Sequence, residues 1–227
     1  RTPAVVDVVL IPAGTFEMGN NAGNDDEKPV HAVTLPAFYI DKYEVTNGLY
    51  QQCVSATICQ EPASHGSATR ADYYGNLQFE NYPVINVSWE MAKTYCEWRG
   101  ARLPTEAEWE KAARGTDGRT YPWGESKPDG SQANFADLNA PVSWADKNVN
   151  DGFKCTSPAG WYSPKGDSPY GCADMAGNVW EWCADWYDEN YYKTAPLKNP
   201  PGPAQTKSRA LRGGSWVSDF NVVRTSF

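Results

Sequence analysis

The stretch Ala173-Asp-Met-Ala-Gly-Asn-Val-Trp-Glu-Trp-Cys-Ala-Asp-Trp186 decides the fold of this chain. From position 179 onward, valine, glutamate and cysteine alternate with two tryptophans and an alanine, which predicts a buried strand with its indoles in the core. Gly177-Asn178 predicts a turn before this strand, because both residue types tolerate positive φ. Acid and amide groups at such a turn can bind a metal or anchor backbone groups; a core strand with internally satisfied polar groups is the simpler alternative.

The composition around this stretch predicts an aromatic core held between many turns. The 227 residues include 10 Trp, 13 Tyr and 7 Phe, while 19 Gly and 17 Pro supply the turns. This length fits one large domain or two small ones, and we interpret residues 1–227 as a single domain. Short aliphatic runs argue against a helical bundle and against a nucleotide-binding α/β sheet.

Charge and hydropathy exclude several classes of partner. The formal net charge of −8 repels phosphates, so we expect no nucleic-acid binding, whereas acidic loops favour cations. The sequence has no apolar run of about 18 residues, so it predicts no membrane span. Its first residues lack the pattern of a signal peptide, which predicts a chain numbered after processing.

Six cysteines, at positions 53, 59, 96, 155, 172 and 183, predict disulfides. They form no C-x-x-C pair, and only two histidines accompany them, so a zinc site is disfavoured. Cys53 and Cys59 bracket a short loop, and Cys155 and Cys172 flank a loop rich in Gly, Pro and Ser. Disulfides at these places indicate an oxidising compartment, extracellular or periplasmic, and the pairing of the six thiols stays open.

Two N-terminal segments carry strand patterns. Residues 5–18 are rich in β-branched side chains and predict a hairpin around a turn at residues 12–14. Residues 32–44 alternate and are interrupted by Pro36, which predicts a strand with an edge or bulge at the proline. The acidic loop 20–29 between them could hold a cation, although a solvated charge run is the simpler interpretation.

Capping residues predict three short helices, over residues 47–53 after Thr46, 89–99 after Ser88, and 105–114 before Gly115. In the third, Thr105 and Glu108 have the spacing of a capping box. Acids in a first turn suit the helix dipole, so we interpret Glu106, Glu108 and Glu110 as capping and surface charges in preference to a catalytic carboxylate pair.

Two long segments, 54–85 and 120–170, are predicted to be loops. The second contains Asn and Asp clusters at residues 133–135 and 148–153, whose oxygens are of the kind that calcium prefers. A bound cation would replace the hydrogen-bond ladder that such a loop lacks. Beyond the tryptophan-rich stretch, residues 209–216 predict a short strand that enters a double-glycine bend.

A series of motifs runs along the chain: Ile11-Pro-Ala-Gly-Thr-Phe-Glu-Met-Gly19, Tyr39-Ile-Asp-Lys-Tyr-Glu-Val-Thr-Asn47, Tyr82-Pro-Val, Arg102-Leu-Pro-Thr-Glu-Ala-Glu-Trp-Glu110, Tyr121-Pro-Trp-Gly124, Gly177-Asn-Val-Trp-Glu-Trp182 and Leu211-Arg-Gly-Gly-Ser-Trp216. In this order the motifs resemble those of the formylglycine-generating-enzyme (sulfatase-modifying-factor) family. The resemblance covers nearly the whole chain. It implies an α+β fold, a variant of the C-type-lectin fold, with short strands, two to three helices and long calcium-stabilised loops. It does not by itself imply activity, because fold does not determine function.

The resemblance also implies cation sites. Oxidase members of the family hold calcium through an Asn side chain, the next carbonyl, an Asp and a carbonyl two residues later. The matching positions are Asn134 with Phe135, and Asp151 with Phe153. A second cation site of the family lies at the Gly-Asn-Val-Trp-Glu-Trp turn, and here it would use Asn178 and Glu181.

The chain departs from the family at the catalytic position. Oxidase members hold copper through two cysteines after the Gly-Gly-Ser-aromatic bend, and Ser218 and Val223 stand near those positions. Cu(I) requires soft thiolate ligands, so we expect no copper-dependent formylglycine formation. The iron-dependent sulfoxide synthases of the family take ligands from a separate histidine-bearing domain, which is absent here, so iron is disfavoured too.

A second departure concerns the end of the domain. Family members continue to a closing Gly-Phe-Arg strand, whose cysteine in some members pairs with the position of Cys96. This strand is missing from the sequence. Either the sequence is truncated or a partner supplies the strand, and a sheet edge left open is prone to aggregation.

Three functions remain in competition. The first is a secreted, non-catalytic binding or accessory domain with structural calcium and a protein partner, or a glycan or peptide ligand. Receptor proteins diversified by retroelements vary this part of the same fold, so we expect a ligand surface at Trp216, Ser218, Asp219, Phe220 and Asn221. The second is a metal-dependent oxidase of the family, and the third is a structural subunit of an extracellular assembly.

Overall fold

The computed structural model describes residues 3–227. Over that range the chain forms three α-helices, six short strands and three 3-10 turns. The helices are α1 (Asn47–Ser55), α2 (Trp89–Trp98) and α3 (Glu106–Arg114), and the strands are β1 (Val8–Ile11), β2 (Gly14–Met18), β3 (His31–Leu35), β4 (Phe38–Asp41), β5 (Glu181–Trp186) and β6 (Arg209–Arg212). The 3-10 turns are η1 (Asp25–Glu27), η2 (Leu77–Phe79) and η3 (Tyr191–Lys193). This content confirms the predicted α+β class with short strands and three helices.

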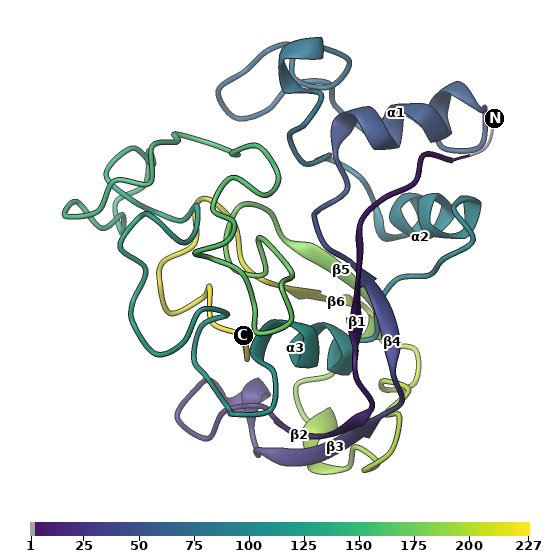
Figure 1. Cartoon of the computed structure of the whole chain (residues 1–227), viewed down its shortest axis with the longest axis vertical. Helices are drawn as coiled ribbons and strands as arrows, with labels where there is room; N and C mark the ends of the chain where they lie inside the picture. The colour runs from purple at the N-terminus through teal and green to yellow at the C-terminus, as the bar shows by residue number, and fades with distance from the viewer. Residues whose placement is uncertain (1–2) are drawn as a thin grey trace.

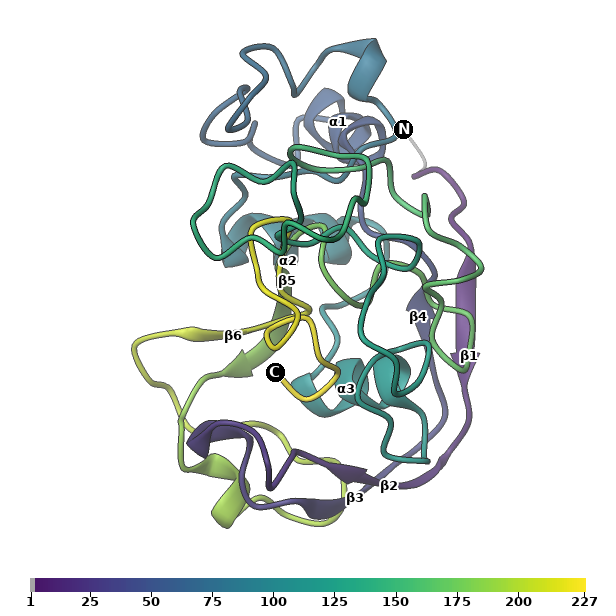
Figure 2. The same cartoon turned by 90° about the vertical axis from the view of Figure 1, so that its left-hand side faces the viewer.

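The strands form three antiparallel pairs, β1 with β4, β2 with β3, and β5 with β6. Figure 1 shows β1 beside β4 along one side of the molecule, with α1 and α2 at one end and the β2–β3 pair at the other. Figure 2, turned by 90°, shows the same two ends. The helix α3 lies between them and carries Trp109, which is fully buried. Core clusters on both sides of α3 join it to β2, β5 and β6.

The N-terminal hairpin predicted around residues 12–14 is wrong. β1 pairs with β4 and β2 pairs with β3, so neither of the first two strands pairs with the other. The register is continuous across both pairs, because Ile11 faces Phe38 and Gly14 faces Leu35. The chain therefore reverses at the acidic loop after β2, and the two prolines, Pro12 and Pro36, mark a shared bend where both strands lack a donor.

The three helices begin where their caps predict. Thr46, Ser88 and Thr105 each accept a hydrogen bond from the backbone N–H three residues later. The α3 cap is reciprocal, since the Glu108 side chain accepts from the Thr105 N–H at 2.8 Å. Of the two roles predicted for the glutamates of this helix, capping is confirmed for Glu108, whereas the prediction of surface charges is wrong, because Glu108 is 6% exposed and Glu110 is fully buried.

The prediction that the indoles of the tryptophan-rich stretch lie in the core is also wrong. Cys183 and Asp185 are buried, whereas Trp180 is 37% exposed. Trp109 and the alanines of α3 already fill the core beside Cys183. The indoles lie on the opposite face, where Trp182 donates its Nε1–H to the Val87 carbonyl at 3.1 Å.

Only one of the predicted disulfides forms among the described residues, between Cys53 and Cys59. Cys96, Cys155, Cys172 and Cys183 are free. Cys155 and Cys172 do not close the loop that they flank, because Cys172 packs in the core beside Cys183 and Trp109 while Cys155 contacts Ser67. Buried thiols in these places act as small apolar side chains.

The predicted loops at residues 54–85 and 120–170 are confirmed. The second contains only turns, bends and isolated bridges, and it covers the left side of the molecule in Figure 1. The two loops are joined by Arg70, whose guanidinium lies over the Phe79 and Tyr82 rings and donates to Thr156. Within residues 3–227, no helix has both the length and the apolarity required to cross a bilayer.

Candidate functional site

The turn before β5 is packed directly against the Asn-rich loop. The Asn178 N–H donates to the Asn134 carbonyl at 2.8 Å, and the Asn134 Nδ2 donates to the Asn178 Oδ1 at 3.0 Å. A Cβ atom on Gly177 would lie only 2.1 Å from the Asn134 carbonyl oxygen, so this approach requires glycine. The structure thus brings together two predicted sites that are 44 residues apart in the chain.

Asp151 organises the other half of the loop. Its carboxylate accepts the Phe153 N–H at 2.8 Å and the Phe135 N–H at 3.0 Å. Burial raises the pKa of Asp151 to about 7, and the neighbouring Asp137 carboxylate adds to the rise. A cation beside Asp151 would favour the ionised form of this carboxyl group and would thereby stabilise the folded state.

The four residues predicted to hold calcium have a donor set that fits the ion. They supply oxygen atoms only, which suits a hard cation. The Asn134 Oδ1 is buried and has no hydrogen-bond partner within residues 3–227, although the nitrogen of the same amide donates twice. The Phe153 carbonyl accepts no hydrogen bond from any other described residue. A cation bound at this site would provide a partner for these two oxygens and for the buried Asp151 carboxylate.

The Asn178 side chain does not fit a second cation. Its Oδ1 accepts from the Asn134 amide at 3.0 Å and from the Ser157 N–H at 2.9 Å, which uses both lone pairs. Its Nδ2 donates to the Glu44 Oε2. The second expected ligand, Glu181, accepts from the Trp109 Nε1–H at 3.0 Å through one oxygen only. Asn178 is therefore a structural anchor that joins three loops.

Two acidic residues near this anchor were not singled out in the sequence. Glu44 and Asp174 are buried, and burial is the main cause that raises the pKa of Glu44 well above its usual range and the pKa of Asp174 to about 6. Burial also raises the pKa of Glu181 to about 7, with a contribution from Asp174. Even so, no three acidic, histidine or cysteine side chains in residues 3–227 are arranged to hold a metal. Only the motif context of Glu44 and Asp174 could have drawn attention to them.

The bend after β6 carries the two positions where the family's copper ligands were expected. Both side chains lie against Gly214, since a Cβ there would be 3.0 Å from Val223 Cγ1 and 3.4 Å from Ser218 Cβ. Val223 is fully buried in an apolar cluster with Tyr121 and Phe135. The Ser218 hydroxyl accepts from the Ser215 N–H at 3.0 Å. The structure brings the two positions together, and neither offers a thiolate.

The expected ligand surface follows directly from this bend. Trp216, Ser218, Asp219 and Phe220 are half-buried and Asn221 is exposed. The segment is anchored on the two sites above, because the Trp216 N–H donates to the Asn178 carbonyl and the Ala136 N–H donates to the Ser218 carbonyl. Trp144, which is 58% exposed, extends over it and donates to the Val217 carbonyl. Trp144 is an aromatic member of this surface that the motifs did not reveal.

Beneath the bend lies a buried charge network that the sequence did not predict. The Glu110 carboxylate accepts from Arg114 at 2.8 Å and from Arg212 at 2.5 Å, and also from the Gly19 N–H. Arg212 donates in addition to the Thr225 carbonyl. The network holds β6 and the segment after the bend against α3, so it determines where the candidate surface lies.

The whole chain is similar to known proteins. Residues 1–227 match the model of the sulfatase-modifying factor enzyme 1-like domain. The formylglycine-generating enzyme of Streptomyces coelicolor is 36% identical to the chain, over 92% of this chain and 78% of the relative. The inactive C-alpha-formylglycine-generating enzyme 2 of Bos taurus is 33% identical, over 93% of this chain and 77% of the relative.

Other similar proteins carry the same unit in a different context. The serine/threonine-protein kinase pkn1 of Chlamydia pneumoniae is 37% identical over 95% of this chain, which spans only 34% of that relative. Among solved structures, PvdO from Pseudomonas aeruginosa superimposes with a TM-score of 0.77 at 27% identity, over 97% of this chain and 86% of that chain. The family match over the whole sequence, together with these relatives, shows that the chain belongs to the formylglycine-generating-enzyme (sulfatase-modifying factor) domain family.

Proposed function

We propose that the chain is a non-catalytic binding or accessory domain on the formylglycine-generating-enzyme scaffold. The observation that carries this proposal is the pair Ser218 and Val223 against Gly214, where a buried valine and a hydrogen-bonded serine stand at the expected copper-ligand positions. Neither side chain can provide the soft sulfur that Cu(I) requires. A relative of similar identity that is described as inactive supports the same conclusion.

The proposed domain uses calcium as a structural ion. Asn134, Asp151 and the carbonyls of Phe135 and Phe153 would hold it, and its charge would offset the buried Asp151 carboxylate. In this role the ion supplies cross-links within a loop that has no ladder of its own. Its position beside Asn178 would stiffen the support of the ligand surface.

The proposed ligand surface comprises Trp216, Ser218, Asp219, Phe220 and Asn221, together with Trp144. The half-buried rings of Trp216 and Phe220, the exposed Trp144 indole and the polar groups beside them suit a protein partner, or a glycan or peptide ligand. The Cys53–Cys59 disulfide supports an extracellular or periplasmic location, where such bonds persist. A structural subunit of an extracellular assembly remains the second candidate function, favoured by the outer edge of β4, where the Tyr39 and Asp41 N–H groups have no hydrogen-bond partner among residues 3–227.

Copper titration with a peptide-oxidation assay tests the proposed absence of catalysis. We expect the wild-type chain to bind no stoichiometric Cu(I) and to leave a peptide cysteine unchanged. The double variant Ser218→Cys/Val223→Cys should gain tight Cu(I) binding, because the two positions face the same glycine. Each single variant is the matched control and should bind copper weakly. Stoichiometric copper with turnover in the wild type would overturn the proposal.

A further inference from the structure

A short strip of the second long loop, residues 155–159, is held by the first long loop, residues 54–85. One contact between them is a backbone hydrogen bond, in which the Ala159 N–H donates to the Asn81 carbonyl at 3.0 Å. Another is made by Arg70. Figures 1 and 2 show the first loop at the α1 end of the molecule. These contacts therefore join that end to the loop that carries the proposed calcium ligands.

The contact made by Arg70 has two hydrogen bonds to one residue. Its Nη1 donates to the Thr156 Oγ1 at 2.8 Å, and its Nη2 donates to the Thr156 carbonyl at 3.0 Å. The guanidinium also lies over the rings of Phe79 and Tyr82, with its central carbon 4.8 Å and 4.9 Å from their centroids. A planar group that is stacked on rings and bonded twice has few other orientations, so Arg70 holds Thr156 in place.

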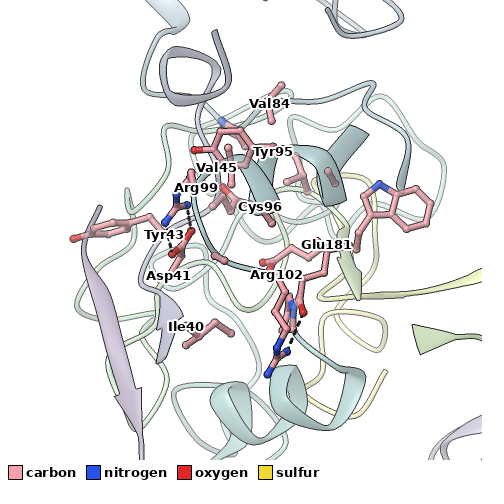
Figure 3. A pocket seen from close by; sticks show the side chains of 18 of the residues that line it. Ile40, Asp41, Tyr43, Val45, Val84, Tyr95, Cys96, Arg99, Arg102 and Glu181 are labelled. Atoms are coloured by element: carbon pink, nitrogen blue, oxygen red, sulfur yellow. Dashed lines mark hydrogen bonds and ion pairs between the residues drawn. The ribbon is translucent and has the colours of Figure 1, made fainter. Parts of the chain in front are cut away.

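No carboxylate determines the orientation of Arg70. Arg99, by contrast, pairs with Asp41, as the dashed lines in Figure 3 mark. Within residues 3–227, Arg70 has no acidic side chain within 4.0 Å of its guanidinium nitrogens. The hydrogen bonds of this charged group go instead to the neutral oxygens of Thr156. Arg70 is therefore oriented toward the strip and not toward an ion-pair partner.

The two neighbours of Thr156 in the chain orient the Asn134 amide. The Cys155 carbonyl accepts from the Asn134 Nδ2 at 2.9 Å. The Ser157 N–H donates to the Asn178 Oδ1 at 2.9 Å, and this oxygen is the second acceptor of the same Nδ2. Both hydrogens of the Asn134 amide are thus used, and its Oδ1 is left without a partner within residues 3–227. That free oxygen is one of the proposed calcium ligands.

We propose that Arg70 is a positioning residue for the calcium site. Because it holds Thr156, it fixes the neighbouring carbonyl and N–H that orient the Asn134 amide, and the amide oxygen stays free for the ion. Coupling between two parts of a protein is reciprocal, so calcium at the site also orders residues 54–85. This inference rests on the proposed calcium site and deepens it, because it makes the first long loop a part of the domain that responds to calcium.

Positioning and electrostatics predict opposite effects of Arg70 on calcium binding. A guanidinium repels a cation, so its removal strengthens calcium binding if charge alone matters. If Arg70 positions the Asn134 amide, its removal weakens calcium binding, because loss of a residue that orients a metal ligand typically lowers the affinity by about 10- to 100-fold. The sign of the change in affinity therefore separates the two roles.

Calorimetric titration of the full chain with calcium measures the affinity. Arg70→Met keeps an apolar side chain over the rings and removes both donors, so it should raise the Kd for calcium by about tenfold or more. Arg70→Lys keeps the charge but not the paired donors, and its Kd should lie between those of the wild type and Arg70→Met. This second variant retains more of the native contacts, so it tests the proposal even if Arg70→Met does not fold.

Arg209→Met is the matched control. Arg209 also stacks on aromatic rings, those of Trp89 and Trp186, and it also donates to a backbone carbonyl, that of Ala184. It lies in β6, outside both long loops. Arg209→Met should therefore bind calcium as the wild type does, even where it lowers the stability of the fold.

Hydrogen exchange gives the reciprocal measurement, at the amides of Tyr73 and Tyr74. Both donate to the His65 carbonyl within the first long loop. Saturating calcium should slow their exchange in the wild type, and it should do so much less in Arg70→Met. A residue that contributes only to stability would not change this response to the ion.

The proposal is contradicted if Arg70→Met binds calcium as the wild type does or more tightly, or if Arg209→Met weakens binding equally. Calcium that leaves the exchange of Tyr73 and Tyr74 unchanged in the wild type also contradicts it. A wild type that binds no calcium removes the calcium site and this inference with it. Calcium binding that does not depend on Arg70 removes the inference alone, and the copper test of the non-catalytic function is separate from all of these results.

Discussion

At the scale of single residues, the molecule depends on charges that are fully buried. Glu110 is enclosed by two arginines and a backbone N–H, and Arg212 is buried with it. This network depends on contacts between segments that are far apart in the chain, so no local sequence pattern predicts it. Glutamates at alternate positions in a first helical turn look like surface charges until the β6 arginine is placed against them.

Glu110→Gln should be among the most destabilising conservative changes in the chain. It leaves Arg114 and Arg212 buried with reduced compensation, which typically costs about 3–5 kcal/mol. Chemical denaturation of both forms measures the difference. Glu97→Gln removes an exposed i,i+4 pair with Lys93 and is the control, expected within about 0.5 kcal/mol. If the two substitutions lower the free energy of unfolding equally, the buried network contributes no more to stability than an exposed ion pair does.

Asp185 gives a residue-level prediction for pH. Burial raises its pKa to about 6, although the carboxylate accepts the Glu106 N–H at 2.8 Å. The folded state therefore holds a proton that the unfolded state releases near pH 4, so this group stabilises the protein at low pH and the contribution is lost as the pH rises toward 6.

Asp185→Asn removes that titration and keeps an oxygen for the Glu106 N–H. Relative to the wild type, the variant should gain stability as the pH rises from about 4 to 6, by on the order of 2 kcal/mol. Urea denaturation at several pH values measures the difference between the two proteins, in which the other carboxylates cancel. A difference that stays constant with pH would refute the raised pKa.

At the scale of elements, prediction worked where the determinants are local. Thr46, Ser88 and Thr105 cap the three helices as their spacing indicates, since a cap involves residues only three apart. The first hairpin failed because strand pairing is not local. Residues 5–18 carry the correct strand pattern, but their partners in β3 and β4 could not be identified from Pro12-Ala-Gly14, which resembles a turn.

The α3 cap is a test at this scale. Thr105→Ala removes the acceptor of the Glu108 N–H and should cost about 1 kcal/mol of unfolding free energy. Thr105→Ser keeps the hydroxyl and should lose much less. Thr94→Ala, inside α2, removes a hydroxyl that bonds only to the Glu90 carbonyl and is the matched control. A Ser variant as unstable as the Ala variant would indicate that the threonine methyl, and not the cap, is responsible.

At the scale of the whole molecule, the long loops determine how much of the site could be predicted. The motifs located Asn134, Asp151 and Asn178 in sequence, yet the contact between Asn134 and Asn178 is visible only in three dimensions. The same holds for Ser218 and Val223, which meet at Gly214. Buried acids and cavities arise from packing between distant segments, so the buried Glu44 and Asp174 had no sequence signal of their own.

The molecule-wide consequence of the proposed calcium site is a stability that depends on the ion. A ligand that binds only the folded state raises the free energy of unfolding by about 2.7 kcal/mol at one hundred times its Kd. Calcium should therefore raise the Tm of the wild type, and chelation should lower it. Asp151→Asn should abolish the calcium response, because it removes the only carboxylate among the four proposed ligands. Asp129→Asn changes an exposed aspartate in the same long loop and should respond as the wild type does. Differential scanning calorimetry with and without calcium measures these differences. If the Tm of the wild type does not change with calcium, the proposed site is wrong and hydrogen bonds alone support the long loop.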